Sequence, residues 1–149
     1  MKEKGIWQES SVAYTPQQNG VVELLNRTAV ESARSMLHSA EDPVYLWAEA
    51  VSCAIYLQNR SVNKSSVTGR TPYETWKGVK PNISHLRVFG SEVFVHVPKG
   101  KRGKFDPKAI KCLHMGYCET QKAFRAWDPS SRKILISRDV IFNERIILS

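Results

Sequence analysis

The chain has 149 residues, of which 42% are hydrophobic, and its formal net charge is +8. This length fits one ordinary domain or two small ones, and the hydrophobic content excludes a wholly disordered chain. We expect no membrane span, because no run of about eighteen apolar residues is present. The first residues lack the apolar stretch of a signal peptide. The three cysteines have no metal-ligand spacing, so we expect free thiols in a reducing compartment.

The positive charge lies in the second part of the chain. Up to Arg60 there are five basic and seven acidic residues, whereas the remainder carries 17 basic and seven acidic ones. A basic surface of this kind favours a polyanionic partner, most simply nucleic acid. Charge alone is also consistent with a surface that only keeps the protein soluble.

A long helix is predicted from about Gln17 to about Ser39. Its start has two interpretations: Thr15 caps it with Pro16 in the first position, or it begins later, at Asn19-Gly20. Apolar residues recur along it at three- and four-residue steps, which predicts one buried face. The residues of this face are Val22, Leu25, Ala29, Ala33, Met36 and Leu37.

A second helix is predicted from Pro43 to Arg60, with Asp42 as its cap. It is apolar on most sides, which predicts burial against more than one neighbour. Residues 61–70 have the composition of a linker, and residues 71–78 predict one short helix capped by Thr71. Tyr73 and Trp76 either pack on another surface or stack on bases, and their helical spacing favours packing.

From His85 onward, hydrophobic residues alternate with a period of two, which is typical of strands. Tight turns separate the segments, so about five short strands predict a small closed barrel rather than a parallel sheet. The predicted strands are Leu86–Phe89, Val93–Val97, Ile110–Tyr117, Ala123–Trp127, Lys133–Ser137 and Val140–Phe142.

This part contains three histidines, His85, His96 and His114, and a cysteine, Cys112, that could suggest a metal site. Zinc sites normally show short paired ligand spacings, and these residues do not. We therefore predict structural or surface roles for the three imidazoles.

A basic segment joins two of the predicted strands and contains Lys99, Lys101, Arg102 and Lys104. Four cations on a connecting loop can neutralise a phosphate chain. A solvated turn or a nuclear-import signal explains the segment equally well. Further cations along the following hairpin would extend the patch: Arg125, Arg132, Lys133 and Arg138.

Several motifs together carry a family resemblance. Near the start the chain reads Gly5-Ile6-Trp7-Gln8-Glu9-Ser10-Ser11, then Tyr14-Thr15-Pro16-Gln17-Gln18-Asn19-Gly20-Val21-Val22-Glu23 and Asn26-Arg27-Thr28. Matching segments continue at residues 33–37, 47–51, 71–74, 85–90 and 138–142. Over nearly its whole length the chain resembles the integrase of copia-type LTR retrotransposon polyproteins.

The resemblance implies an α+β fold in three parts. Residues 1–60 would be the C-terminal helical part of a truncated RNase H-like integrase core. Residues 61–84 would be a linker with a short helix, and residues 85–145 a small SH3-like β-barrel. Most of the sheet that covers the helices in such a core would have to come from residues that this chain lacks.

The resemblance also implies a site. Glu23 corresponds to the third acid of an Asp, Asp, Glu metal site, and Asn19, Asn26 and Arg27 flank it near DNA. Taken alone, a Glu beside an apolar helix face is usually solvated or paired. A pair of Mg²⁺ ions needs several carboxylates, and the two Asp residues of the family lie upstream of this segment. Asp42 follows Glu23 in the chain and stands in for neither.

We therefore expect a fragment of a retrotransposon integrase. Its parent carries out Mg²⁺-dependent DNA integration, whereas the fragment is expected to be inactive alone, to bind no Mg²⁺ and to retain nucleic-acid binding. The alternative is a non-catalytic module that binds nucleic acid or another protein. The expected partners are DNA, the remainder of the Pol polyprotein and, as an open option, further copies of the chain. We expect no membrane partner and a location in cytoplasm and nucleus.

The chain departs from the family pattern at several positions. Leu24 follows Glu23 where a basic residue is usual, and His114 stands in a strand position where the family has Phe. Other departures are Gln8, Ala13, Ser91, Ala123 and Ala126. Such changes are typical of a diverged copy.

Overall fold

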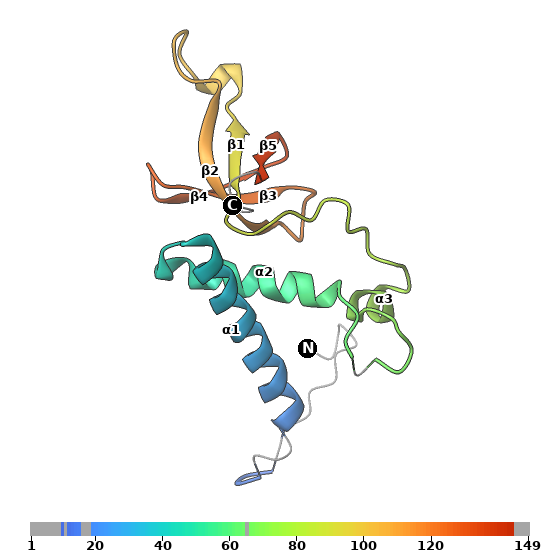
Figure 1. Cartoon of the computed structure of the whole chain (residues 1–149). Coiled ribbons are helices and arrows are strands. Elements are labelled where there is room, and N and C mark those ends of the chain that lie inside the picture. Colours follow the sequence, from blue (N-terminus) through green and yellow to red (C-terminus); the bar gives the residue numbers. More distant parts are fainter. Residues whose placement is uncertain (1–9, 11, 16–18, 65, 145–149) are drawn as a thin grey trace.

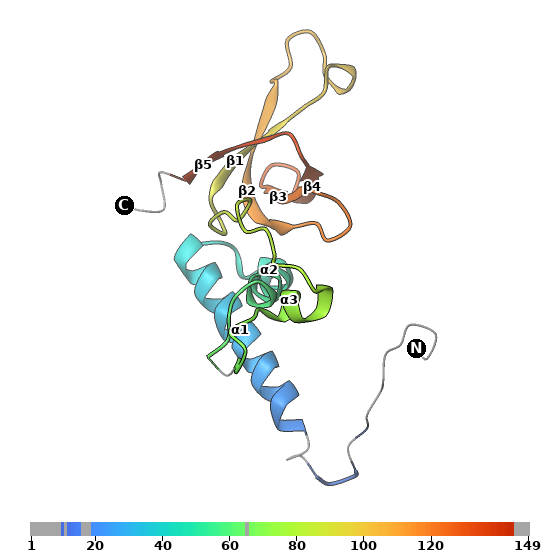
Figure 2. The ribbon, with the colours of Figure 1, turned by 90° about the vertical axis from the view of Figure 1, so that its right-hand side faces the viewer.

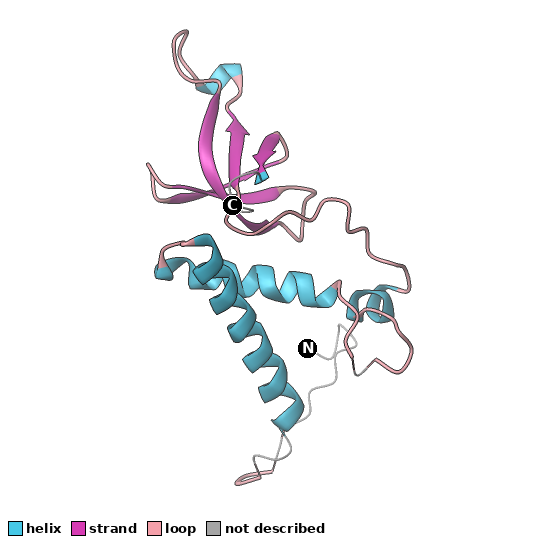
Figure 3. Cartoon of the chain, viewed as in Figure 1, coloured by secondary structure: helices cyan, strands magenta, loops and turns pink. Residues whose placement is uncertain are grey.

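The computed structural model describes residues 10, 12–15, 19–64 and 66–144. Its helices gather at one end of the molecule and its strands at the other (Figures 1 and 3). The helices are α1 (Gly20–Ala40), α2 (Trp47–Asn59) and α3 (Pro72–Lys77), with short 3-10 turns at Val44–Leu46 and Lys99–Lys101. The strands are β1 (Glu92–His96), β2 (Ala109–Tyr117), β3 (Phe124–Asp128), β4 (Lys133–Ser137) and β5 (Val140–Asn143).

Helix α1 begins at Gly20 with Asn19 at its N-cap, so the later of the two predicted starts is confirmed. Pro16 and the predicted start at Gln17 lie outside the described residues. The hydroxyl of Thr15 donates instead to the carbonyl of Val12. The helix ends at Glu41, which adopts a left-handed conformation with a φ of 55°.

Only the second half of α1 buries its apolar face. Ala29 and Ala33 are buried, whereas Val22 and Leu25 are 58% and 53% exposed. The prediction of one continuous buried face was therefore wrong for the first turns. Figure 2 shows the reason, because the first turns of α1 extend beyond α2 and away from the sheet.

The second predicted helix is divided into a 3-10 turn and α2, and Asp42 caps neither of them. Ala50, Cys53 and Ala54 form the buried side of α2. Trp47, at 60% exposure, lies on its open side. Burial on most sides was therefore predicted too broadly.

The strands form one five-stranded antiparallel sheet in the order β4-β3-β2-β1-β5. Within the described residues the end strands β4 and β5 do not pair with each other, so the sheet is open and the predicted closure was wrong. We call this open sheet the barrel. The predicted strand Leu86–Phe89 is irregular backbone instead. Gly90 N–H donates to the carbonyl of His114 at 2.7 Å, and His114 N–H donates to the carbonyl of Ser91 at 2.8 Å. Pairing with β2 therefore starts beyond Phe89, although the Phe89 side chain is buried.

The helices and the sheet share one hydrophobic core. Helix α2 packs against β2, and a Cβ atom added to Gly116 of β2 would lie 3.4 Å from Cys53 Cβ. This side of α2 is therefore covered by the sheet of the same chain. The buried residues of this core are Ala33, Leu46, Ala50, Cys53, Ala54, Phe89, Met115, Tyr117 and Trp127.

A second, smaller buried cluster lies on strands β1, β2 and β3 and consists of Val93, Val95, Cys112 and Ala126. Alternate residues of β1 contribute to it, as expected for a strand with one inward face. Among the helices of the described chain, none has the length and apolarity that a bilayer crossing requires.

Candidate nucleic-acid interface

Glu23, which the family resemblance assigns to a metal site, and the residues that it places near DNA lie at the open end of α1. Glu23, Asn26 and Arg27 follow at three- and four-residue steps, so they share one side of the helix. All three are exposed, and Asn19 is exposed at the N-cap. The same half of the helix exposes four large apolar side chains, namely Val21, Val22, Leu24 and Leu25.

The described residues do not build a metal site around Glu23. No three His, Cys, Asp or Glu side chains in the described part of the chain lie close enough together to hold a metal ion. A two-metal centre needs several converging carboxylates. Magnesium therefore does not fit these residues by themselves, and no reaction step can be assigned to them.

The predicted basic segment forms the connection between β1 and β2 and projects from the barrel at the end opposite α1 (Figure 1). Lys99, Lys101 and Lys104 are exposed. Arg102 is half-buried, and its Nε atom has no hydrogen-bond partner among the described residues. Three exposed lysines and one half-buried arginine thus occupy this projection, which we call the basic loop (residues 99–104).

Phe105, at the end of the basic loop, was not singled out from the sequence. Its side chain is 94% exposed, and Lys104 Nζ lies 5.9 Å from the centre of its ring. An exposed ring beside cations can stack on a base while the cations meet phosphate. The sequence signal was the single aromatic residue within a run of cations.

Arg125 was predicted to extend the basic patch, and this was wrong. Its Nε and Nη2 atoms donate to the two carboxylate oxygens of Glu49, each at 2.8 Å. This two-point ion pair joins β3 to α2, and the hydrogen bonds raise the pKa of Arg125. Its charge is therefore neutralised within the fold. The other cations of that prediction, Arg132, Lys133 and Arg138, are exposed.

Helix α3 forms as predicted, because the Thr71 hydroxyl accepts the Glu74 N–H at 3.1 Å and Gly78 ends the helix with a φ of 74°. Its aromatic residues behave differently from each other. Tyr73 is half-buried, with the Arg60 guanidinium 4.9 Å from its ring centre. Trp76 is 78% exposed, so the predicted packing of its ring was wrong.

The three histidines occupy three different environments. His114 is fully buried in the barrel, and burial lowers its pKa to about 4. His85 Nε2 lies 2.7 Å from the hydroxyl of Tyr56. His96 is exposed at the end of β1. The buried and surface positions fit the roles that the spacing predicted.

Known proteins match this chain at two levels, over the strand region and over nearly the whole chain. Residues 91–149 match the retroviral polymerase SH3-like domain, which agrees with the five-stranded sheet. The chain is 46% identical over 140 residues to the retrovirus-related Pol polyprotein from transposon TNT 1-94 of Nicotiana tabacum. The match covers 94% of this chain and 10% of that protein.

Other relatives agree. The Pol polyprotein from transposon RE1 of Arabidopsis thaliana is 32% identical over 140 residues, which are 94% of this chain and 10% of that protein. The Pol polyprotein from transposon RE2 of the same plant is 32% identical over 145 residues, which are 97% of this chain and 10% of that protein. An uncharacterized mitochondrial protein of the same plant is 32% identical over 87 residues, 58% of this chain and 69% of that protein.

Residues 91–149 thus form an SH3-like domain of the retroviral polymerase type. The chain as a whole belongs to the retrovirus-related Pol polyproteins of transposons, which confirms the resemblance found in the sequence. It spans about a tenth of the length of these Pol relatives.

Proposed function

We propose that this chain is a nucleic-acid-binding part of the integrase region of a copia-type Pol polyprotein. The observation that carries the proposal is the basic loop, which places three exposed lysines and an exposed aromatic ring on a projection of the barrel. Cations on such a projection can reach the phosphates of a duplex without a clash between the duplex and the barrel. Proteins of this kind act where nucleic acid is present, so we expect the cytoplasm and the nucleus.

The helical part is, in this proposal, the C-terminal end of an RNase H-like integrase core. Support comes from the first half of α1, where Val22 and Leu25 are more than half exposed although they lie on the apolar face. Another part of the polyprotein is the partner that would cover them. In the complete polyprotein Glu23 would supply one carboxylate of the metal site, with Asn19, Asn26 and Arg27 close to DNA. The Mg²⁺ ions would stabilise charge at phosphorus during DNA integration.

A second candidate function is protein interaction, because the same apolar side chains of α1 offer a surface to another chain. It predicts self-association or capture of a polypeptide, and no salt-sensitive binding of DNA. The two candidates differ in the surface that they require, since the basic loop and the open end of α1 lie at opposite ends of the molecule (Figure 1).

The basic loop can be tested by charge reversal. We expect Lys101→Glu with Lys104→Glu to weaken binding of a labelled duplex of about 20 base pairs by at least about tenfold, because two phosphate contacts become repulsions. Fluorescence anisotropy at low salt measures this.

The matched control is Lys64→Glu with Lys80→Glu, which makes the same change of net charge at exposed positions outside the loop. We expect Glu23→Gln to leave binding unchanged as well. Equal losses in the loop variant and the matched control would show that net charge, rather than the loop, binds DNA.

A further inference from the structure

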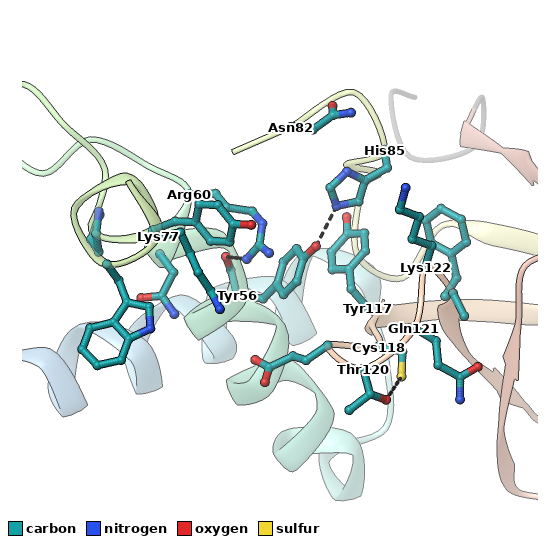
Figure 4. Close-up of a pocket in the computed structure, with 17 residues that line it drawn as sticks. Tyr56, Arg60, Lys77, Asn82, His85, Tyr117, Cys118, Thr120, Gln121 and Lys122 are labelled. Atoms are coloured by element: carbon teal, nitrogen blue, oxygen red, sulfur yellow. Dashed lines mark hydrogen bonds between the residues drawn. The ribbon is translucent and has the colours of Figure 1, made fainter. Parts of the chain in front are cut away.

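A concave site, separate from the basic loop and from Glu23, lies where the end of α2, helix α3 and the β2–β3 connection meet (Figure 4). Its volume is about 1030 Å³. Ligand sites of proteins commonly measure roughly 300–1,000 Å³, so the space is large enough for a ligand of several rings.

One wall of this site is a fixed stack of aromatic rings. Tyr56 stacks on Tyr117 with ring centres 4.5 Å apart and an interplanar angle of 19°. The hydroxyl of Tyr56 points toward His85, as Figure 4 shows, with 2.7 Å between Tyr56 Oη and His85 Nε2. Tyr117 Oη accepts the Arg87 N–H at 2.8 Å. These bonds hold the rings in place before any ligand arrives.

A guanidinium group is held against the same wall. The Arg60 Cζ atom lies 3.4 Å from the centre of the Tyr56 ring, and Arg60 Nη1 donates to the carbonyl of Tyr56 at 3.1 Å. Arg60 has no carboxylate partner in the described part of the chain. The stacked guanidinium therefore keeps its charge available at the edge of the site.

The opposite side is supplied by α3, which has no buried residue. Trp76 lines the site and is 78% exposed, so its indole is not used by the core. Lys77 and Lys122 also line it, are exposed, and form no ion pair with any described residue. Together with Arg60, these lysines give the lining three cationic side chains, against one acidic side chain, Glu119.

We propose that this pocket binds unpaired nucleotides of a nucleic-acid strand, with a base stacked on Trp76 and the neighbouring phosphates held by Lys77 and Lys122. Single strands are bound without sequence preference by this combination of an open aromatic face and a groove of cations. The excess of positive charge in the lining excludes a cationic ligand and favours a polyanion. The inference deepens the proposed function, because it adds a single-strand site to a chain proposed to bind duplex through its basic loop.

The experiment measures binding of the whole chain to labelled oligothymidine and oligouridine of about twelve nucleotides, alongside the duplex. We expect Trp76→Ala to weaken single-strand binding by about tenfold, the usual loss for one stacked base, and to leave duplex binding unchanged. Lys77→Gln with Lys122→Gln should weaken it by a similar factor. The matched control is Trp47→Ala, since Trp47 is 60% exposed on α2 and does not line the pocket.

A second readout does not depend on affinity. A base stacked on an indole quenches its fluorescence, so oligothymidine should quench the tryptophan emission of the chain, and Trp76→Phe should remove that quench. Because Trp76 is exposed on a helix without buried residues, both substitutions are expected to leave the fold intact.

The outcomes separate this inference from the proposed function. Single-strand affinities that are equal in Trp76→Ala and Trp47→Ala, with duplex binding intact, would overturn the pocket assignment and leave the proposed function standing. A chain that binds neither the duplex nor the single strands would overturn both. Poly-glutamate binding that depends on Trp76, without single-strand binding, would assign the pocket to acidic peptides and overturn the inference. A preference between oligothymidine and oligouridine would support it and identify DNA or RNA as the ligand.

Discussion

His114 is a polar residue that is fully buried among aromatic side chains. Its ring lies among those of Tyr117, Phe124 and Phe142, with centres 5.1, 5.8 and 5.2 Å away. Neither ring nitrogen has a hydrogen-bond partner among the described residues. Burial, and to a smaller extent the charge of Arg87, lower the pKa of His114 to about 4. The imidazole is therefore neutral near pH 7, and its buried nitrogens cost stability.

This placement makes folding sensitive to acid. The unfolded chain takes up a proton on this imidazole near pH 6.5, whereas the folded chain does so only near pH 4. The unfolded state thus binds more protons in that window, and the free energy of unfolding falls as the pH is lowered from 6.5 to 4. The shift corresponds to at most about 3 kcal/mol.

We expect His114→Phe to raise the free energy of unfolding by about 1 kcal/mol near pH 7, because two unpaired buried nitrogens are removed. The gain should grow toward pH 5. Urea unfolding at both pH values measures it, with His96→Phe at the exposed end of β1 as the control. A gain that does not change with pH would show that folding does not lower the pKa of His114.

The carboxyl of Asp42 gives the free energy of unfolding a pH dependence opposite to that of His114. Both variants that are compared must therefore retain Asp42. It is 9% exposed, its Oδ2 atom has no hydrogen-bond partner among the described residues, and burial raises its pKa to about 6. The folded chain therefore holds this proton more tightly, and stability falls as the pH rises from about 4 to about 6. Both histidine variants retain Asp42, so its contribution cancels in their comparison.

At the scale of elements, the C-terminal end of α1 packs against Gly90, which precedes β1. Gly90 precedes β1 with a φ of 76°, and a Cβ atom added there would lie 2.2 Å from Ala40 Cβ and 3.0 Å from Asp42 Oδ2. Gly78, at the end of α3, has a φ of 74° and nothing within 4 Å of such an atom. The two glycines have nearly the same φ and differ in the neighbours that an added Cβ atom would meet.

We expect Gly78→Ala to cost about 1–2 kcal/mol of stability, the usual strain of an alanine in the left-handed region. Gly90→Ala should cost at least about 2 kcal/mol more, because overpacking against α1 is added to the same strain. Chemical denaturation of the two variants gives the difference. Equal losses would mean that α1 does not touch the barrel at Gly90.

The sequence predicted the elements better than the contacts between them. The period of two in residues 93–97 identified β1, because alternate residues of that strand are buried. The apolar run in residues 133–137 identified β4, although its residues are half-buried or exposed. Leu86–Phe89 has the same composition, but its neighbours Gly90 and Ser91 pair with His114, and the ladder begins only after them. Local composition does not contain that information.

The contacts that join the helices to the barrel were not predictable in the same way. The Glu49–Arg125 pair links residues 76 positions apart, and nothing near either residue indicates the other. For the same reason Arg125 was assigned to the basic patch and Trp76 to a packed surface. At the open end of α1, the apolar period is present in the sequence, but no described residue buries Val22 and Leu25.

At the scale of the whole molecule, one core connects two parts of opposite charge. The first sixty residues are slightly acidic and the remainder is strongly basic, while Phe89, Met115 and Trp127 of the barrel region share a core with α1 and α2. The helical part thus serves as a support for the barrel in this chain. The open end of α1 and the basic loop lie at opposite ends of the molecule (Figure 1).

The most direct test of the account is the salt dependence of duplex binding by the unmodified chain. If Lys99, Lys101 and Lys104 each neutralise one phosphate, the logarithm of the association constant should fall with the logarithm of salt concentration with a slope of about −3. Anisotropy titrations between about 50 and 200 mM salt give that slope. A slope near zero, or no binding at the lowest salt, would contradict the proposal that this barrel binds nucleic acid through its basic loop.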